Sequence, residues 1–168
     1  MYVRTPWMAL AALGGIVFAA GGAVMGSMNA GAFGLQRDAD AVFPFLGLGV
    51  LMLATGWAAS RQGWGSTFLG KAAAALVVLG AVFFLANPVL QFAILGTLSF
   101  GLGLVLFTVT LWRQRLMTGA DRLLATLAAV GSLTWNTETL SAFLLVPVGL
   151  LLAVLSVRMR PAADRQDS

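Results

Sequence analysis

The chain contains no cysteine and no histidine. Without cysteine it can form neither a disulfide nor a thiolate nucleophile, and without both residue types it lacks the usual ligands of zinc and of haem iron. Histidine is also the side chain that most often serves as a general base near neutral pH. Because these absences remove the commonest reactive groups, we expect no catalytic, cofactor-binding or metal-binding residues in this chain.

Charged residues are scarce as well. They make up 10% of the 168 residues, whereas about a quarter is usual in soluble domains. The six acidic residues all fall in predicted loops or in the C-terminal tail: Asp38, Asp40, Asp121, Glu138, Asp164 and Asp167. Ionisable groups at membrane depth mark ion pathways and proton relays. Their distribution here argues against ion-coupled transport, and we expect no enzymatic activity.

Hydrophobic residues are abundant instead, at 60% of the chain with a mean hydropathy of +0.93. A transmembrane helix needs about 20 apolar residues. Apolar stretches cover residues 8–28, 41–60, 70–87, 89–112, 123–136 and 140–157. The sequence therefore predicts an all-α, polytopic integral membrane protein. Its single domain, residues 1–160, is a compact bundle of six transmembrane helices, and a short polar tail follows over 161–168.

The fifth stretch is the shortest, and the distribution of charge supports its crossing. Its roughly 14 residues make a helix of about 21 Å, against a hydrocarbon core of about 30 Å. With six crossings only Arg37 lies on the outer face, whereas five crossings leave six basic residues on one face and four on the other. The nine basic residues that share a face are Arg4, Arg61, Lys71, Arg113, Arg115, Arg122, Arg158, Arg160 and Arg165.

These basic residues set the predicted orientation and exclude one class of partner. Short loops rich in lysine and arginine stay in the cytoplasm, so both termini are predicted to be cytoplasmic. Arginine supplies nine of the ten basic residues, a bias typical of GC-rich bacteria, and the predicted location is the inner (plasma) membrane of a bacterium. The sequence pI is about 11.2, but the net charge is only +4 and is spread over several segments. Nucleic-acid binding needs a clustered basic face, so we expect no nucleic-acid partner.

The five tryptophans agree with this topology. Indole rings concentrate where lipid headgroups meet the hydrocarbon core. Trp7, Trp57, Trp64 and Trp112 lie at predicted cytoplasmic ends of helices, and Trp135 lies at an outer end. We expect all five to form interfacial belts.

Small residues recur along the first apolar stretch. Gly15, Ala19, Gly22 and Gly26 follow one another at spacings of four, three and four residues. Such a stripe lets two helices approach closely, and Gly22 and Gly26 match the small-xxx-small pattern. We favour packing against another helix of the same chain. The alternative is that the stripe binds a membrane-protein partner or a second copy of the chain.

Two prolines mark breaks in helices. Pro88 follows Asn87 and predicts a tight turn between the third and fourth helices, because proline disfavours helical geometry in the residue before it. Pro147 falls inside the sixth stretch, where it lacks a backbone donor and its ring clashes one turn earlier, near Phe143. We expect a static kink at Pro147, and a hinge is the alternative.

Hydroxyl side chains are the main polar groups at predicted membrane depth. In such positions they bond to their own backbone or to another helix, which is the interpretation we favour. Lining of a narrow polar path is the alternative. They lie in the fourth and fifth stretches: Thr97, Ser99, Thr108, Thr110, Thr126, Ser132 and Thr134.

Two classes of function remain, both set in the lipid bilayer. The first is a non-catalytic multi-pass membrane protein that serves as a structural or accessory subunit of a membrane assembly. The small-residue stripe and the missing reactive groups support it. The alternative is an oligomeric passive channel or transporter for a small uncharged solute, with the hydroxyl groups of the fourth and fifth helices facing its path.

Overall fold

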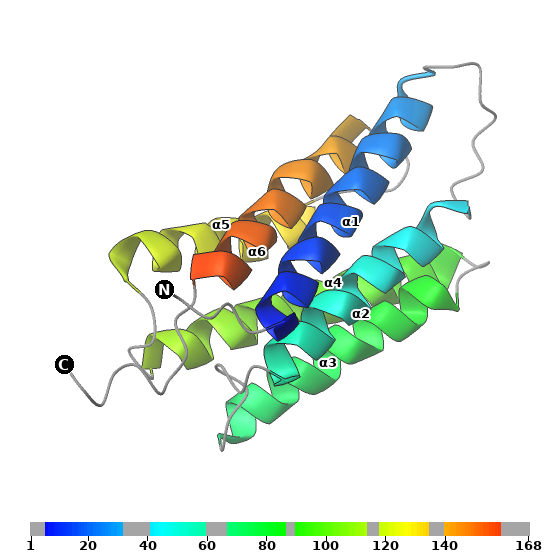
Figure 1. Ribbon diagram of the computed structural model, residues 1–168. Helices are drawn as coiled ribbons and strands as arrows, with labels where there is room; N and C mark the ends of the chain where they lie inside the picture. Colours follow the sequence, from blue (N-terminus) through cyan, green and yellow to red (C-terminus); the bar gives the residue numbers. More distant parts are fainter. Residues whose placement is uncertain are drawn as a thin grey trace.

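The computed structural model describes residues 6–31, 41–59, 67–86, 90–113, 118–134 and 140–158. Within these ranges the chain is all-α, as predicted. The elements in order (Figure 1) are α1 (Pro6–Asn29), α2 (Phe43–Ala59), α3 (Phe68–Leu85), α4 (Leu90–Arg113), α5 (Gly119–Thr134), the 3-10 segment η3 (Leu140–Leu144) and α6 (Leu145–Arg158). Each α-helix corresponds to one of the six predicted helices, with shifted ends.

Helix α5 begins four residues earlier than predicted, at Gly119 instead of Leu123. Thr118 caps it. The backbone N–H of Asp121 donates to the Thr118 hydroxyl oxygen at 3.3 Å, and that hydroxyl donates to a carboxylate oxygen of Asp121 at 2.6 Å. A cap of this kind satisfies N–H groups that the start of a helix leaves open. The prediction that Asp121 lies in a loop is therefore wrong, since the residue belongs to the first turn of α5.

The sixth predicted helix consists of two segments. Residues 140–144 form η3, and α-helical geometry starts only at Leu145. The ring of Pro147 clashes with an α-helical carbonyl four residues back, at Phe143, which explains why the α-helix does not reach residue 140. Pro147 is the third residue of α6, where the missing N–H needs no helical partner. The distortion predicted one turn before Pro147 is therefore present as the change from η3 to α6, near the start of the helix and not at its middle.

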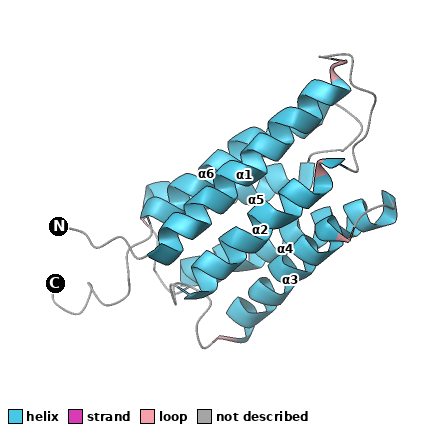
Figure 2. Ribbon diagram, turned by 45° about the vertical axis from the view of Figure 1, so that its right-hand side comes forward, coloured by secondary structure: helices cyan, strands magenta, loops and turns pink. Residues whose placement is uncertain are grey.

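The helices form a closed ring (Figures 1 and 2). Each packs against its neighbours in the sequence, and α6 packs against α1. Neighbouring helices run antiparallel. Gly56 near the end of α2 approaches Trp7 at the start of α1, and Arg158 at the end of α6 binds Asp121 at the start of α5. Because directions alternate around the ring, the start of α1 and the end of α6 lie at the same end of the bundle.

All five charged residues of the described ranges lie at this same end, which we call the charged end. They occupy the first turns of α3 and α5 and the last residues of α4 and α6: Lys71, Arg113, Asp121, Arg122 and Arg158. The alternation of helices thus brings together four of the nine basic residues that the sequence assigns to one face. The other basic residues lie outside the described ranges: Arg4, Arg37, Arg61, Arg115, Arg160 and Arg165.

Glycine lets α1 approach both of its neighbours. A Cβ atom at Gly14 would lie 2.5 Å from the carbonyl oxygen of Gly49 in α2. A Cβ atom at Gly149 in α6 would lie 2.5 Å from the carbonyl oxygen of Gly15. Carbon atoms in ordinary contact stay about 3.5–4.0 Å apart, so a larger residue at either position would push the helices apart.

The small-residue stripe of α1 packs within the chain, as the sequence favours. Gly15 faces Gly149 and Ala153 of α6, and a Cβ atom at Gly22 would overlap the side chain of Leu145. A Cβ atom at Gly26 would lie 2.6 Å from the ring of Phe143 in η3. The stripe is therefore the α1 side of the contact that closes the ring.

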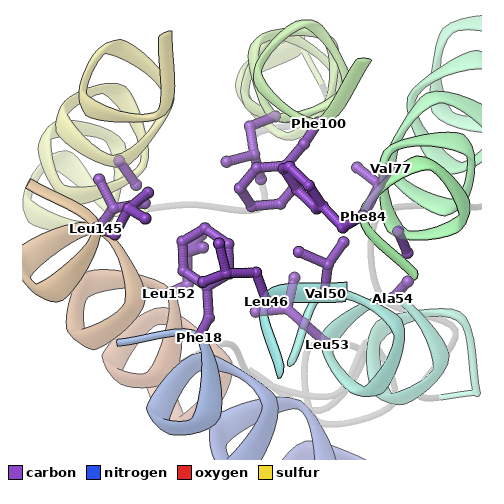
Figure 3. Packing of buried hydrophobic residues seen from close by; sticks show 14 of the residues in the cluster. Phe18, Leu46, Val50, Leu53, Ala54, Val77, Phe84, Phe100, Leu145 and Leu152 are labelled. Carbon is purple, nitrogen blue, oxygen red and sulfur yellow. The ribbon is translucent and has the colours of Figure 1, made fainter. Parts of the chain in front are cut away.

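Aromatic side chains fill the centre of the ring (Figure 3). The rings of Phe18 in α1 and Phe100 in α4 meet there with centroids 5.2 Å apart. Trp57 in α2 stacks on Phe107 in α4, with centroids 4.3 Å apart. The first contact joins helices on opposite sides of the ring, and the second joins two helices that α3 separates, so the interior of the bundle is a packed core.

The outside of the bundle is apolar on every helix. Four helical segments, residues 6–29, 68–85, 92–113 and 141–158, are long and apolar enough to span a membrane, and α2 is a shorter apolar helix. Soluble proteins rarely expose large continuous apolar surfaces, whereas lipid tails surround such surfaces without cost. The helices therefore indicate a membrane location. One exposed apolar residue from each of α1 to α6 is Ile16, Phe45, Leu79, Leu98, Leu127 and Val154.

Candidate functional site

An ion pair joins α5 and α6 at the charged end. The Nε–H of Arg158 donates to Asp121 Oδ1 at 2.7 Å, while the Thr118 hydroxyl donates to the other carboxylate oxygen. The Asp121 side chain is 9% exposed and that of Arg158 is 49% exposed. A negative charge at a helix start and a positive charge at a helix end also suit the two helix dipoles. Both carboxylate oxygens of Asp121 therefore accept hydrogen bonds, and the ion pair links the start of α5 to the end of α6.

The sequence contains a signal for this ion pair that the distribution of basic residues over the two membrane faces does not reveal. Thr118 and Asp121 have the spacing of a capping pair, which places the start of α5 at Gly119. In a ring of antiparallel neighbours, the start of α5 and the end of α6 lie at the same level. Asp121 and Arg158 are therefore brought together by the packing of α5 on α6 across 37 positions of sequence.

Arg122 lies beside this pair but interacts with α4 instead. Its Cζ atom lies 5.9 Å from the centre of the Trp112 ring, within the range of a cation–π interaction. Its Nε atom is buried, and among the described residues no acceptor pairs with it. Arg113, the last residue of α4, is exposed. The meeting point of α4 and α5 thus carries two guanidinium groups.

Trp57 belongs to the interior, which corrects the prediction that it lies in an interfacial belt. The residue is 1% exposed, and its Nε1–H donates to the hydroxyl oxygen of Ser156 in α6 at 2.8 Å. The Ser156 hydroxyl in turn donates to the carbonyl oxygen of Leu152 at 2.8 Å. This buried hydrogen bond links α2 to α6, which α1 separates in the ring. Trp7 and Trp112 are exposed, as interfacial residues require.

The hydroxyl groups of α4 and α5 bond to their own helices. Six of the seven hydroxyl groups named from the sequence, all except Ser99, donate to a carbonyl oxygen three or four residues earlier in the same helix, at 2.7–3.2 Å, as the favoured interpretation predicts. Their protons are therefore engaged by the backbone. The residues that bond in this way are Thr97, Thr108, Thr110, Thr126, Ser132 and Thr134.

Metal-ligating side chains do not gather anywhere in the part of the chain that the structure describes. Asp121 is the acidic residue of that part, and Arg158 and Thr118 bind it. The other sequence features singled out above lie outside the described ranges: Asp38, Asp40, Glu138, Asp164, Asp167, Trp64, Trp135, Asn87 and Pro88.

Comparisons with known proteins give no relative from which a function could be transferred. No protein-family model matches the chain, and searches of curated proteins and of solved structures found no match. The features of the chain that bear on function are therefore the ring of helices, its filled centre and its charged end.

Proposed function

We propose that the chain crosses the inner (plasma) membrane of a bacterium six times, with both termini in the cytoplasm. The alternating helix directions and the single charged end support this topology. The 17 residues of α2 and the 16 of α5 make helices of about 26 and 24 Å. Each is a few ångströms shorter than a hydrocarbon core of about 30 Å, and such a mismatch costs fractions of a kcal/mol per ångström.

Engineered cysteines test the topology, because the chain has none of its own. We expect cysteine at Ala30 or Thr134 to react with an impermeant maleimide on intact cells, since both residues are exposed at the end opposite the charged end. Cysteine at Ala59 or Gly119, exposed at the charged end, is expected to react only after permeabilisation. Protection of both Thr134→Cys and Gly119→Cys on intact cells, with labelling of both only after permeabilisation, would show that α5 does not cross.

Within this membrane, the chain acts as a non-catalytic structural or accessory subunit of a larger assembly. The observation that carries this proposal is the filled centre of the ring, where Phe18, Phe100 and Trp57 pack against other helices. The stripe that includes Gly15 and Gly22 is occupied by α6, so a partner bound there would have to displace α6. The outward apolar sides of the helices are the surfaces that remain for partner contact.

The contacts of the hydroxyl groups favour this role over an oligomeric channel for an uncharged solute. A polar path needs side chains that exchange their hydrogen bonds with the solute. Six hydroxyls of α4 and α5 donate to their own backbones instead, which is the usual arrangement of such groups in a membrane helix that is only structural.

Purification in mild detergent tests the role. The tagged chain is produced at its natural level, extracted, and weighed intact by native mass spectrometry, with an unrelated tagged helical membrane protein as the control. We expect the chain to bind a different membrane protein at a fixed ratio that the control does not bind. A homo-oligomer without any partner, which also carries uncharged solute into proteoliposomes, would refute the accessory role and support the channel.

A further inference from the structure

The place where α4 ends and α5 begins carries positive charge that no described carboxylate neutralises. This α4–α5 corner consists of Trp112 and Arg113 at the end of α4 and Arg122 in the first turn of α5. The acidic side chain of the described ranges, Asp121, binds Arg158 at 2.7 Å and has its second oxygen on Thr118. The charges of Arg113 and Arg122 are therefore available to an anion.

The Arg122 side chain is held in an orientation and an environment that favour binding of an anion. Its guanidinium lies over the Trp112 ring at 5.9 Å, which restricts its orientation. The residue is half-buried, and its buried Nε–H has no acceptor among the described residues. A partly buried cation without an anionic partner is unfavourable. The planar fork of arginine matches the oxygens of a phosphate group, which it binds through two parallel hydrogen bonds.

The surroundings of the corner suit a lipid. Val109, one turn before Trp112 on the same face of α4, is exposed, and so is Leu123, next to Arg122. Apolar side chains below a cationic group offer a surface for acyl chains beside a site for the headgroup. Trp112 itself is half exposed at the helix end, the position that interfacial tryptophans take at headgroup level.

We propose that the α4–α5 corner binds the phosphate of an anionic phospholipid, with Arg122 as the principal ligand and Arg113 as a second cation. The inference goes beyond the accessory role and is independent of the number of crossings, because it needs only that the charged end meets the headgroups of a bilayer. A phosphate ion in solution has the same chemistry, and the acyl chains distinguish the two.

Native mass spectrometry of the delipidated protein in detergent tests the proposal, with phosphatidylglycerol and phosphatidylcholine added in separate titrations. We expect one phosphatidylglycerol molecule to bind in preference to phosphatidylcholine. Arg122→Gln is expected to weaken this binding on the order of tenfold, the usual effect of losing a charge-assisted hydrogen bond. Lys71→Gln is the matched control, because it removes an exposed cation from the same end of the bundle without touching the corner.

Further variants and a soluble competitor complete the test. Trp112→Leu keeps the helix and the charges but removes the ring under Arg122, and it is expected to weaken binding as well. Inorganic phosphate at millimolar concentration is expected not to displace the lipid. Equal binding of the two lipids, equal effects of Arg122→Gln and Lys71→Gln, unchanged binding in both corner variants, or displacement by inorganic phosphate would each overturn the proposal.

Discussion

Replacing Gly15 by leucine places a side chain where α1 and α6 come closest together. A Cβ atom at Gly15 would lie 2.7 Å from the backbone nitrogen of Ala153 and 2.7 Å from the carbonyl oxygen of Gly149. Both atoms belong to the backbone of α6, so rotation of a side chain cannot relieve the overlap. Since carbon contacts are about 3.5–4.0 Å, the first carbon alone forces the helices apart by about 1 Å.

The overpacking cost at Gly15 opposes the gain from the better helix propensity of leucine, and a second variant shows the effect of the same substitution at an open position. Overpacking a well-packed site costs about 1–3 kcal/mol, while leucine gains up to about 1 kcal/mol over glycine inside a helix. Gly119→Leu is the matched control, because no atom lies within 4 Å of a Cβ atom at Gly119. The two variants carry the same substitution, and we expect Gly15→Leu to be less stable than Gly119→Leu by about 1–3 kcal/mol.

Thermal unfolding in mild detergent, followed by tryptophan fluorescence, measures the difference. Trp57 is buried in the core and reports the loss of packing. For a chain of this length, 1 kcal/mol corresponds to about 2–4 °C, so the expected gap between the two Tm values is about 2–12 °C. Equal Tm values would refute the contact between α1 and α6, and the stripe of α1 would then be free to bind a partner.

Two further predictions concern the polar contacts of α6. In a double-mutant cycle, Asp121→Asn and Arg158→Gln are expected to give a coupling free energy of about 0.2–1 kcal/mol, because Arg158 is half exposed. The coupling is expected to shrink when salt is raised about tenfold, and no coupling at low salt would contradict the ion pair. Ser156→Ala removes the acceptor of the Trp57 hydrogen bond and is expected to lower the free energy of unfolding by about 0.5–1.5 kcal/mol. Thr134→Ala, at an exposed hydroxyl, is expected to stay within about 0.5 kcal/mol of the wild type in the same melting assay, and equal losses would contradict this reasoning.

The fold class and the first four helices follow from composition. The ends of α1, α2, α3 and α4 agree with the predicted ranges 8–28, 41–60, 70–87 and 89–112 to within two residues. Long apolar runs bounded by charged residues or proline leave few other conformations, because a backbone in lipid must satisfy its own hydrogen bonds. The gathering of the described charges at one end follows from the same alternation of helices and loops.

Two helix starts required local chemistry in addition to hydropathy. The apolar run of α5 begins at Leu123, but the cap formed by Thr118 and Asp121 moves the helix start to Gly119. The sixth run is apolar from Leu140 onward, but Pro147 delays α-helical geometry to Leu145. In both cases the signal is present in the sequence as a spacing between particular residues, and hydropathy alone does not contain it.

Only the tertiary structure decided which side of each helix meets another helix. Except for α5, the helices are apolar on nearly every side, so no contrast between polar and apolar faces separates a side that meets protein from one that meets lipid. For this reason the position of Trp57 near a helix end predicts that it lies at the membrane interface, whereas the packing of the helices places it in the core. The ion pair of Asp121 and Arg158 likewise depends on α5 and α6 being neighbours. The sequence alone determined the helices and the end that carries charge, and the order of helices around the ring determined their contacts.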